Sequence, residues 1–155
     1  MRKRFACAAT LAFLQLSASL IAQESARKLK VYISVDMEGI AGVVTADQLA
    51  PGGFEYERFR RFMTEETLAA ITGARSAGAG DIVVSDSHGN GESLLIDLFP
   101  KDVTVVRSWP RHGGMMAALD KTFDAAIFIG YHASTTNPSG VRAHTFPVLT
   151  LRALC

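Results

Sequence analysis

Hydrophobic and polar residues along this chain form patterns typical of strands separated by helices and loops. Four short runs, rich in β-branched and other apolar residues, predict strands at residues 29–35, 81–85, 103–107 and 125–130. The runs are continuously apolar rather than alternating, which is the pattern of strands covered on both faces of a sheet. We therefore expect an α/β protein, a layered fold with a largely parallel sheet.

A longer segment between the first two strands has the period of an amphipathic helix. Apolar and small residues recur there at steps of three and four, from Tyr56 to Ala77. Gly78 and Gly80 follow and mark the expected end of this helix. Residues 92–99 and 114–119 have the composition of two shorter helices, so helices are expected to alternate with the strands.

The beginning of the chain differs from the rest. A short basic start precedes residues 5–22, which are mostly apolar and uncharged, and this composition is typical of a secretory signal peptide. We expect cleavage after Ala22, with residues 17–19 as a rival site and an uncleaved membrane anchor as the alternative. The prediction is a signal peptide at 1–22, an α/β catalytic domain at 23–155, no stable membrane span after processing, and a periplasmic or secreted protein.

Composition excludes several classes of function. The 155 residues carry 16 Lys and Arg against 15 Asp and Glu, so there is no basic excess to neutralise a phosphate backbone and no nucleic-acid partner is expected. The hydrophobic fraction of 48% is that of a folded chain rather than a disordered one. Once the signal peptide is removed, Cys155 is the remaining thiol, which excludes an internal disulfide and a cysteine-type zinc site.

Residues that can bind metal follow three of the predicted strands. Asp36 and Glu38 follow the first strand, His88 follows the second, and His132 follows the fourth. Because ligands bind beyond the carboxyl ends of parallel strands, these side chains are expected at one edge of the sheet. Carboxylates and imidazoles suit a first-row divalent ion, with zinc the leading candidate, and a site without thiols is typical of catalysis. A shared carboxylate could bridge two metal ions about 4 Å apart.

Each of these residues has a simpler interpretation when taken alone. An acid at a strand end is often a cap, and a lone histidine is usually a hydrogen-bonded surface or core residue, so only convergence favours a metal site. Residues 39–42 lack the spacing of a dinucleotide-binding loop, and Ser85 and Ser87 lack the context of a nucleophile elbow. His112 fits a pocket lining and a surface loop equally well.

Four segments of the sequence resemble one known family. They are SVDMEGIAGVV (34–44), VVSDSHGNG (83–91), GYHA (130–133) and AHTF (143–146). In this order they are similar to the zinc-dependent D-aminopeptidase family associated with bacterial dipeptide-transport operons. The resemblance covers Leu29 to about Phe146, roughly the first half of a family member. Residues 147–155 do not resemble the family's continuation, so we expect the catalytic domain to be incomplete at its C-terminal end.

The resemblance implies a role for each matching residue. Asp36 and Glu38 match the acidic ligands of the family, with Asp36 bridging two zinc ions. His88 and His132 match two further zinc ligands. His144 matches the histidine that the family uses in catalysis, and its own surroundings, a glycine-rich loop, carry no signal for such a role. A further glutamate ligand is implied beyond the last residue of this sequence.

The resemblance also implies an activity and an assembly. The implied enzyme is a metallo-aminopeptidase with two zinc ions per site, which releases N-terminal D-amino acids from short peptides by means of metal-activated water. His144 would shuttle a proton or stabilise the oxyanion. A complete chain is expected to form a ring-like homo-oligomer such as a decamer. Another metal-dependent hydrolase, a truncated non-catalytic metal- or peptide-binding module, and an inactive fragment remain open alternatives.

Overall fold

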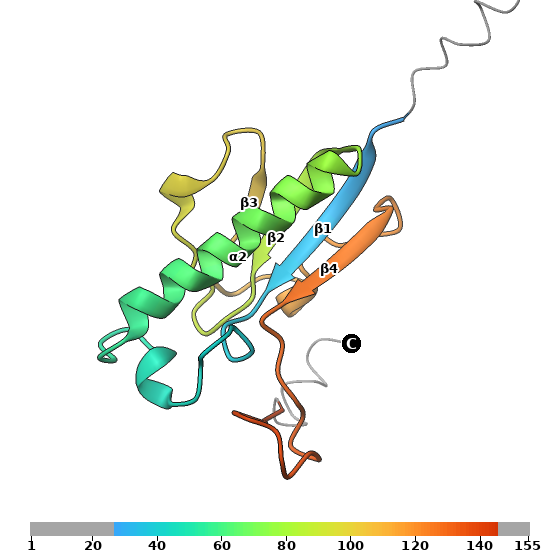
Figure 1. Cartoon of the computed structure of the whole chain (residues 1–155). Coiled ribbons are helices and arrows are strands. Elements are labelled where there is room, and N and C mark those ends of the chain that lie inside the picture. Colours follow the sequence, from blue (N-terminus) through green and yellow to red (C-terminus); the bar gives the residue numbers. More distant parts are fainter. Residues whose placement is uncertain (1–26, 146–155) are drawn as a thin grey trace, which may run out of the picture.

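The computed structural model describes residues 27–145; the predicted signal peptide at 1–22 and residues 146–155 lie outside the described residues. The strands are β1 (Leu29–Val35), β2 (Ala79–Asp86), β3 (Thr104–Val106) and β4 (Ala125–Ile129). They form one sheet in the order β3-β2-β1-β4, with every neighbouring pair parallel (Figure 1). This confirms the predicted α/β class and the parallel sheet. In the part of the chain that is described, no helix is long and apolar enough to cross a membrane.

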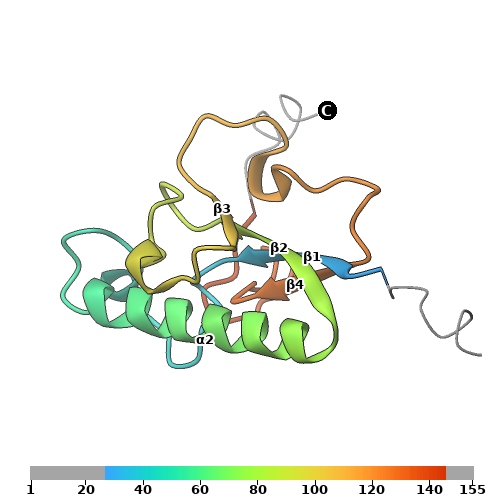
Figure 2. The same ribbon diagram turned by 90° about the horizontal axis from the view of Figure 1, so that it is seen from above.

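The long predicted helix is α2 (Tyr56–Ser76), which covers one face of the sheet (Figure 2). Its residues Phe59, Met63 and Ile71 belong to one buried hydrophobic cluster with Ile33 of β1 and Val84 of β2. The helix ends where the sequence predicts, because Gly78 adopts a left-handed conformation with φ +96° that favours glycine. Burial of this apolar stripe is the main source of stability for the layer.

The two short helices predicted from the sequence are wrong in extent. Segment 92–99 contains only the 3-10 turn η2 (Ile96–Leu98), because the backbone amides of Leu94 and Leu95 donate to side chains outside the segment. Segment 114–119 contains only the turn η3 (Gly114–Met116), and a left-handed Ala118 prevents the turn from continuing as a helix. A third turn, η1 (Ala46–Gln48), lies in the loop after β1.

The face of the sheet opposite α2 is polar, which the continuously apolar pattern did not predict. Figure 2 shows the segment with η3 on this face. Tyr32 and Ser34 of β1 and Ser85 of β2 are fully buried beneath it, and their hydroxyls hydrogen-bond to the carbonyl of Met115. A face covered by backbone needs side chains that donate hydrogen bonds, which explains hydroxyls at these alternating positions. At the β4 edge, Phe128 remains 52% exposed.

Candidate metal centre

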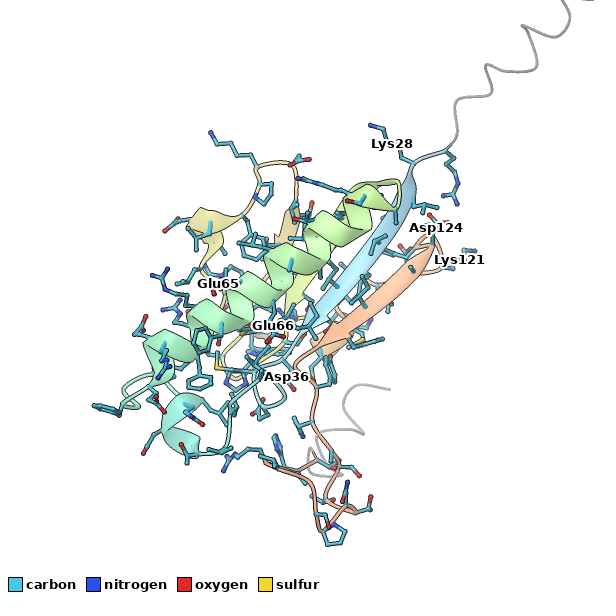
Figure 3. All side chains as sticks on the ribbon, viewed as in Figure 1. Lys28, Asp36, Glu65, Glu66, Lys121 and Asp124 are labelled. Atoms are coloured by element: carbon cyan, nitrogen blue, oxygen red, sulfur yellow. The ribbon has the colours of Figure 1, made fainter. Side chains whose placement is uncertain are left out.

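The site lies at the carboxyl ends of the strands, where the loops after β1 and β4 lie against each other. The amide of Gly39 donates to the carbonyl of Gly130 at 2.6 Å, and the amide of Asp36 donates to Ile129 at 2.8 Å. A Cβ on Gly39 would overlap the carbonyl oxygen of Tyr131, and one on Gly130 would overlap that of Asp36. Only glycine permits this approach, which brings Asp36 (labelled in Figure 3) close to the segment after β4.

His88 joins the two carboxylates. Its Nδ1 lies 2.9 Å from Glu38 Oε2 and 3.3 Å from Asp36 Oδ1. Its Nε2 lies 2.6 Å from the carbonyl oxygen of Leu49, which can only accept, so Nε2 carries a hydrogen. This bond fixes the ring and directs Nδ1 at the acids. All three side chains are at most 10% exposed, so their charges are held away from water.

His132 is oriented in the same way. Its Nδ1 donates to the carbonyl of Ala133 at 2.9 Å, so that the Nε2 lone pair of the neutral ring faces Asp36, with Nε2 3.6 Å from Oδ2. The structure thus brings four sequence-predicted residues together: Asp36, Glu38, His88 and His132. Their convergence follows from the parallel topology, because β1, β2 and β4 end at the same edge of the sheet.

His144 lies at the mouth of this cluster. Its ring stacks on that of His132, with centroids 3.8 Å apart and planes at 14°. Nδ1 donates to the carbonyl of Arg142 at 2.7 Å, so Nε2 of the neutral ring has a free lone pair, 3.9 Å from Glu38 Oε1. The side chain is 51% exposed, whereas those of the other four residues are largely buried. His144 is therefore the member of the cluster that solvent and a bound molecule can reach.

The electrostatics of the cluster are dominated by its buried acids. Burial raises the pKa of Asp36, although the hydrogen bond with His88 acts in the opposite direction. Burial also opposes ionisation of Glu38, but hydrogen bonds with His88 and Asp36 prevail and lower the pKa of Glu38 to about 2. Burial disfavours the imidazolium of His88, yet the bonds to both acids raise the pKa of His88 to about 10. The positive charge of protonated His88 thus offsets the negative charge of the two adjacent carboxyl groups, Asp36 and Glu38.

The residues present fit a divalent metal ion. Ligand atoms of Asp36, Glu38 and His132 all lie within 4.8 Å of one another. Two ligands of one zinc ion, each at about 2.1 Å, are separated by at most roughly 4 Å, so small side-chain shifts would close the site. His88 and His132 each donate one ring N–H to a backbone carbonyl, as metal-bound histidine usually does, and this turns the other ring nitrogen toward the carboxylates. A cation would replace the proton of His88 as the compensating charge.

Asp86 is a buried polar residue whose role the sequence analysis did not assign. Its side chain is inaccessible to solvent; Oδ2 accepts from the amide of Leu94 at 2.7 Å, while Oδ1 has no partner within residues 27–145. Burial raises the pKa of Asp86, and hydrogen bonds from the backbone of Leu94 and Ser93 to the carboxylate oppose this shift. Asp86 holds the loop that follows His88. Its only sequence signal is its place at the end of a strand, which it shares with many capping residues.

The surroundings of the other candidate residues show which interpretation of each one fits the structure. His112 is exposed, as expected for a surface loop. Ser85 and Ser87 are buried and hydrogen-bonded to each other and to the carbonyl of Met115, which is unlike an activated nucleophile. Residues 39–42 shape the loop of the carboxylates rather than a nucleotide site.

The fold and the site together define an α/β protein with a candidate metal centre, whose residue types are those found in metal-dependent hydrolases. The chain belongs to the D-aminopeptidase family, peptidase family M55, whose model matches residues 29–154. The matched range continues past Phe146, so ending the resemblance at that residue was wrong. Membership confirms the family resemblance carried by the four sequence segments.

One protein sequence and one solved structure, both from the same bacterium, are similar to this chain. A D-aminopeptidase of Bacillus subtilis (strain 168) is 36% identical over 117 residues, which are 76% of this chain and 42% of that protein. The solved structure of the Zn-dependent D-aminopeptidase DppA from Bacillus subtilis, described as a self-compartmentalizing protease, superimposes with a TM-score of 0.73 at 35% identity. That match covers 77% of this chain and 43% of DppA, so the chain spans less than half the length of these relatives.

Proposed function

We propose that this chain carries the metal-binding part of a zinc-dependent aminopeptidase that releases N-terminal D-amino acids from short peptides. The observation that carries the proposal is the convergence of two carboxylates and three histidines at one sheet edge, each histidine oriented by a backbone carbonyl. The names of the relatives support the substrate class, since both are called D-aminopeptidases.

Four residues would hold the metal. His132 reaches Asp36, and His88 reaches both Asp36 and Glu38, so Asp36 lies between possible ligands of two ions. This sharing supports a pair of zinc ions bridged by Asp36. Bound zinc would supply Lewis acidity and a water of lowered pKa. The carbonyls of Leu49 and Ala133 would hold the ligand imidazoles in place, by hydrogen bonds to the ring nitrogens that do not face the metal.

His144 is the residue that we expect to act on the substrate. Its half-exposed ring can meet a peptide, and its Nε2 faces the cluster because Arg142 holds Nδ1. In this orientation a neutral His144 can accept a proton at Nε2 from an attacking water, and the resulting imidazolium can donate it to the leaving amine. Stacking on His132 limits ring rotation and so keeps Nε2 aimed at the reaction centre.

The assembly and the location are part of the same proposal. The description of DppA as self-compartmentalizing supports a homo-oligomer for the complete protein, and a ring-like decamer is the form that we expect. The basic start and the uncharged apolar stretch of residues 5–22 support export to the periplasm or secretion. Short peptides with an N-terminal D-residue would then be encountered outside the cytoplasm.

Zinc content and substrate choice test the proposal together. The purified chain is dialysed against zinc-free buffer, its metal is counted per folded molecule, and it is assayed on matched D- and L-aminoacyl peptides and on a phosphoester. We expect about two zinc ions per chain and turnover of the D-peptide alone. A folded chain without zinc, or one that prefers the phosphoester, would contradict the proposal.

A pair of histidine variants tests the assigned role. His144→Ala should abolish turnover while zinc stays bound, because the ring lies outside the proposed ligand set. His112→Ala is the matched control, since His112 is exposed on another loop, and it should retain full activity. Full activity of His144→Ala would remove His144 from the mechanism.

A further inference from the structure

A cluster of hydroxyl groups lies beneath the candidate metal centre, on the face of the sheet opposite α2. Ser34 Oγ is at its centre: it lies 2.7 Å from Ser87 Oγ, 2.8 Å from Tyr131 Oη and 3.1 Å from the carbonyl oxygen of Met115. Ser34 is fully buried, whereas Tyr131 is 37% exposed. The cluster therefore joins the interior of the sheet to the rim of the site.

The three contacts of Ser34 match the hydrogen-bonding capacity of one hydroxyl. A serine Oγ offers one hydrogen and two lone pairs. If Ser34 donates to the carbonyl of Met115, its lone pairs can accept from Ser87 and from Tyr131, and each hydroxyl hydrogen then has an acceptor. Ser85 completes the set by donating to the same carbonyl at 3.0 Å. A network with every group satisfied is rigid and specific, and a partly satisfied one is costly.

The residues of the cluster lie close to the proposed metal ligands in the sequence, which connects the cluster to the candidate metal centre. Ser87 immediately precedes His88, and Tyr131 immediately precedes His132. Ser34 lies two residues before Asp36 on β1. One buried hydroxyl thus connects the three chain segments that bear proposed ligands. Within the described residues, the hydroxyls of Ser34 and Tyr131 hydrogen-bond to none of the proposed ligand side chains.

We propose that Ser34 and Tyr131 are positioning residues that fix the segments bearing Asp36, His88 and His132 relative to one another, and that zinc affinity depends on this network. The proposal rests on the function proposed above, since it requires zinc at this site. Groups that orient ligands without touching the metal typically change metal affinity by about 10- to 100-fold. The network is suited to that role because it adds side-chain hydrogen bonds to the few backbone bonds, such as that from Gly39 to Gly130, that join these segments beyond the strand ends.

Tyr131→Phe is the most informative variant. It removes one hydroxyl and keeps the ring, which packs edge-on against Phe128 with centroids 5.3 Å apart. Tyr32→Phe is the matched control: the Tyr32 hydroxyl also approaches the Met115 carbonyl, at 3.2 Å, but bonds chiefly to Ala117 at 2.8 Å and has no hydrogen bond to Ser34. Both variants lose a hydroxyl, and only Tyr131→Phe loses a hydrogen bond to Ser34.

Zinc affinity is measured by competition with a chromogenic chelator, alongside urea unfolding of the zinc-free chains and the visible spectrum of the cobalt-substituted forms. We expect Tyr131→Phe to weaken zinc binding by about 10-fold or more and to shift the cobalt bands. Tyr32→Phe should lower stability while leaving affinity and spectrum unchanged. Ser34→Ala combined with Tyr131→Phe should weaken binding no more than the stronger single variant, because both remove the same bond.

The outcomes separate this inference from the proposed function. If the unaltered chain binds zinc and Tyr131→Phe binds it equally well with the same cobalt spectrum, the positioning role is overturned and the metal site stands. Equal loss of affinity in Tyr131→Phe and Tyr32→Phe would also overturn it, because a general packing effect would then suffice. A folded, unaltered chain that binds no zinc would overturn both.

Discussion

The amide of Gly39 donates a hydrogen bond of 2.6 Å to the carbonyl of Gly130, and this contact joins the two loops that bear the candidate ligands. Gly39 follows Asp36 and Glu38 in the loop after β1, and Gly130 precedes His132 in the loop after β4. The contact is possible because neither residue has a Cβ, which would overlap the opposite backbone. Gly39 and Gly130 thus allow the carboxylates of Asp36 and Glu38 to lie close to the imidazole of His132.

The first prediction concerns Gly130→Ala. The new Cβ would overlap the carbonyl oxygen of Asp36, and Gly130 has φ +66°, which L-residues rarely adopt. We expect the free energy of unfolding to fall by roughly 1–3 kcal/mol, with zinc binding lost, as measured by urea unfolding and metal content. Gly73→Ala on the exposed face of α2, where a Cβ meets nothing within 4 Å, should instead stabilise the chain by about 1 kcal/mol. Equal stability of the two variants would refute this account of the loop contact.

The second prediction concerns the charge of Glu38. Glu38→Gln keeps the size of the side chain but removes the charge that faces His88 at 2.9 Å. We expect zinc affinity to fall by about 10-fold or more, because a neutral amide is a poorer ligand than a carboxylate. Glu66→Gln is the control, on the exposed surface of α2 (Figure 3), and should bind zinc like the unaltered chain. Chelator competition measures both, and matching affinities would exclude Glu38 from the ligand set.

The third prediction contrasts two aspartates. Asp86→Ala removes the buried acceptor of the Leu94 amide and should cost about 1–3 kcal/mol of unfolding free energy. Asp102→Ala breaks an exposed ion pair with Arg75, 2.7 Å long, and should cost at most about 1 kcal/mol. Thermal or urea unfolding of both variants in parallel checks the order. A larger loss for Asp102→Ala would show that the loop after His88 does not depend on Asp86.

The fourth prediction is a pH dependence. The backbone amide of Lys30, 2.7 Å from Asp124, and the side chain of Arg27 lower the pKa of Asp124 in the folded chain. Because the folded value lies below the unfolded one, ionised Asp124 stabilises the fold above about pH 4, and this contribution is lost as the pH falls through the folded value. Asp124→Asn should therefore show a smaller loss of stability on acidification. Identical acid unfolding profiles for the two chains would contradict this.

Much of this protein follows from local sequence. The strands and α2 were predicted within a few residues, because their hydrophobic periods are properties of neighbouring positions. The convergence of Asp36, Glu38, His88 and His132 was also predictable, since parallel strands end at one edge. His144 came from family resemblance alone. The signal peptide at 1–22 stays a prediction.

Tertiary structure decided what depends on distant residues. Segment 92–99 stays largely non-helical because two of its backbone amides donate to side chains outside it. The amide of Leu94 donates to Asp86 of β2, eight positions away, and that of Leu95 donates to Thr64 of α2. Ser34 meets Tyr131 across 97 positions, and His144 stacks on His132 through a loop whose path no period encodes. A hydrophobic pattern records which side of an element is buried, but hydrogen bonds between separate segments depend on atomic positions that exist only once the sheet has formed. Local sequence thus specifies the secondary-structure elements and the sheet edge where the site lies, whereas long-range contacts fix how the side chains of the site are oriented and held.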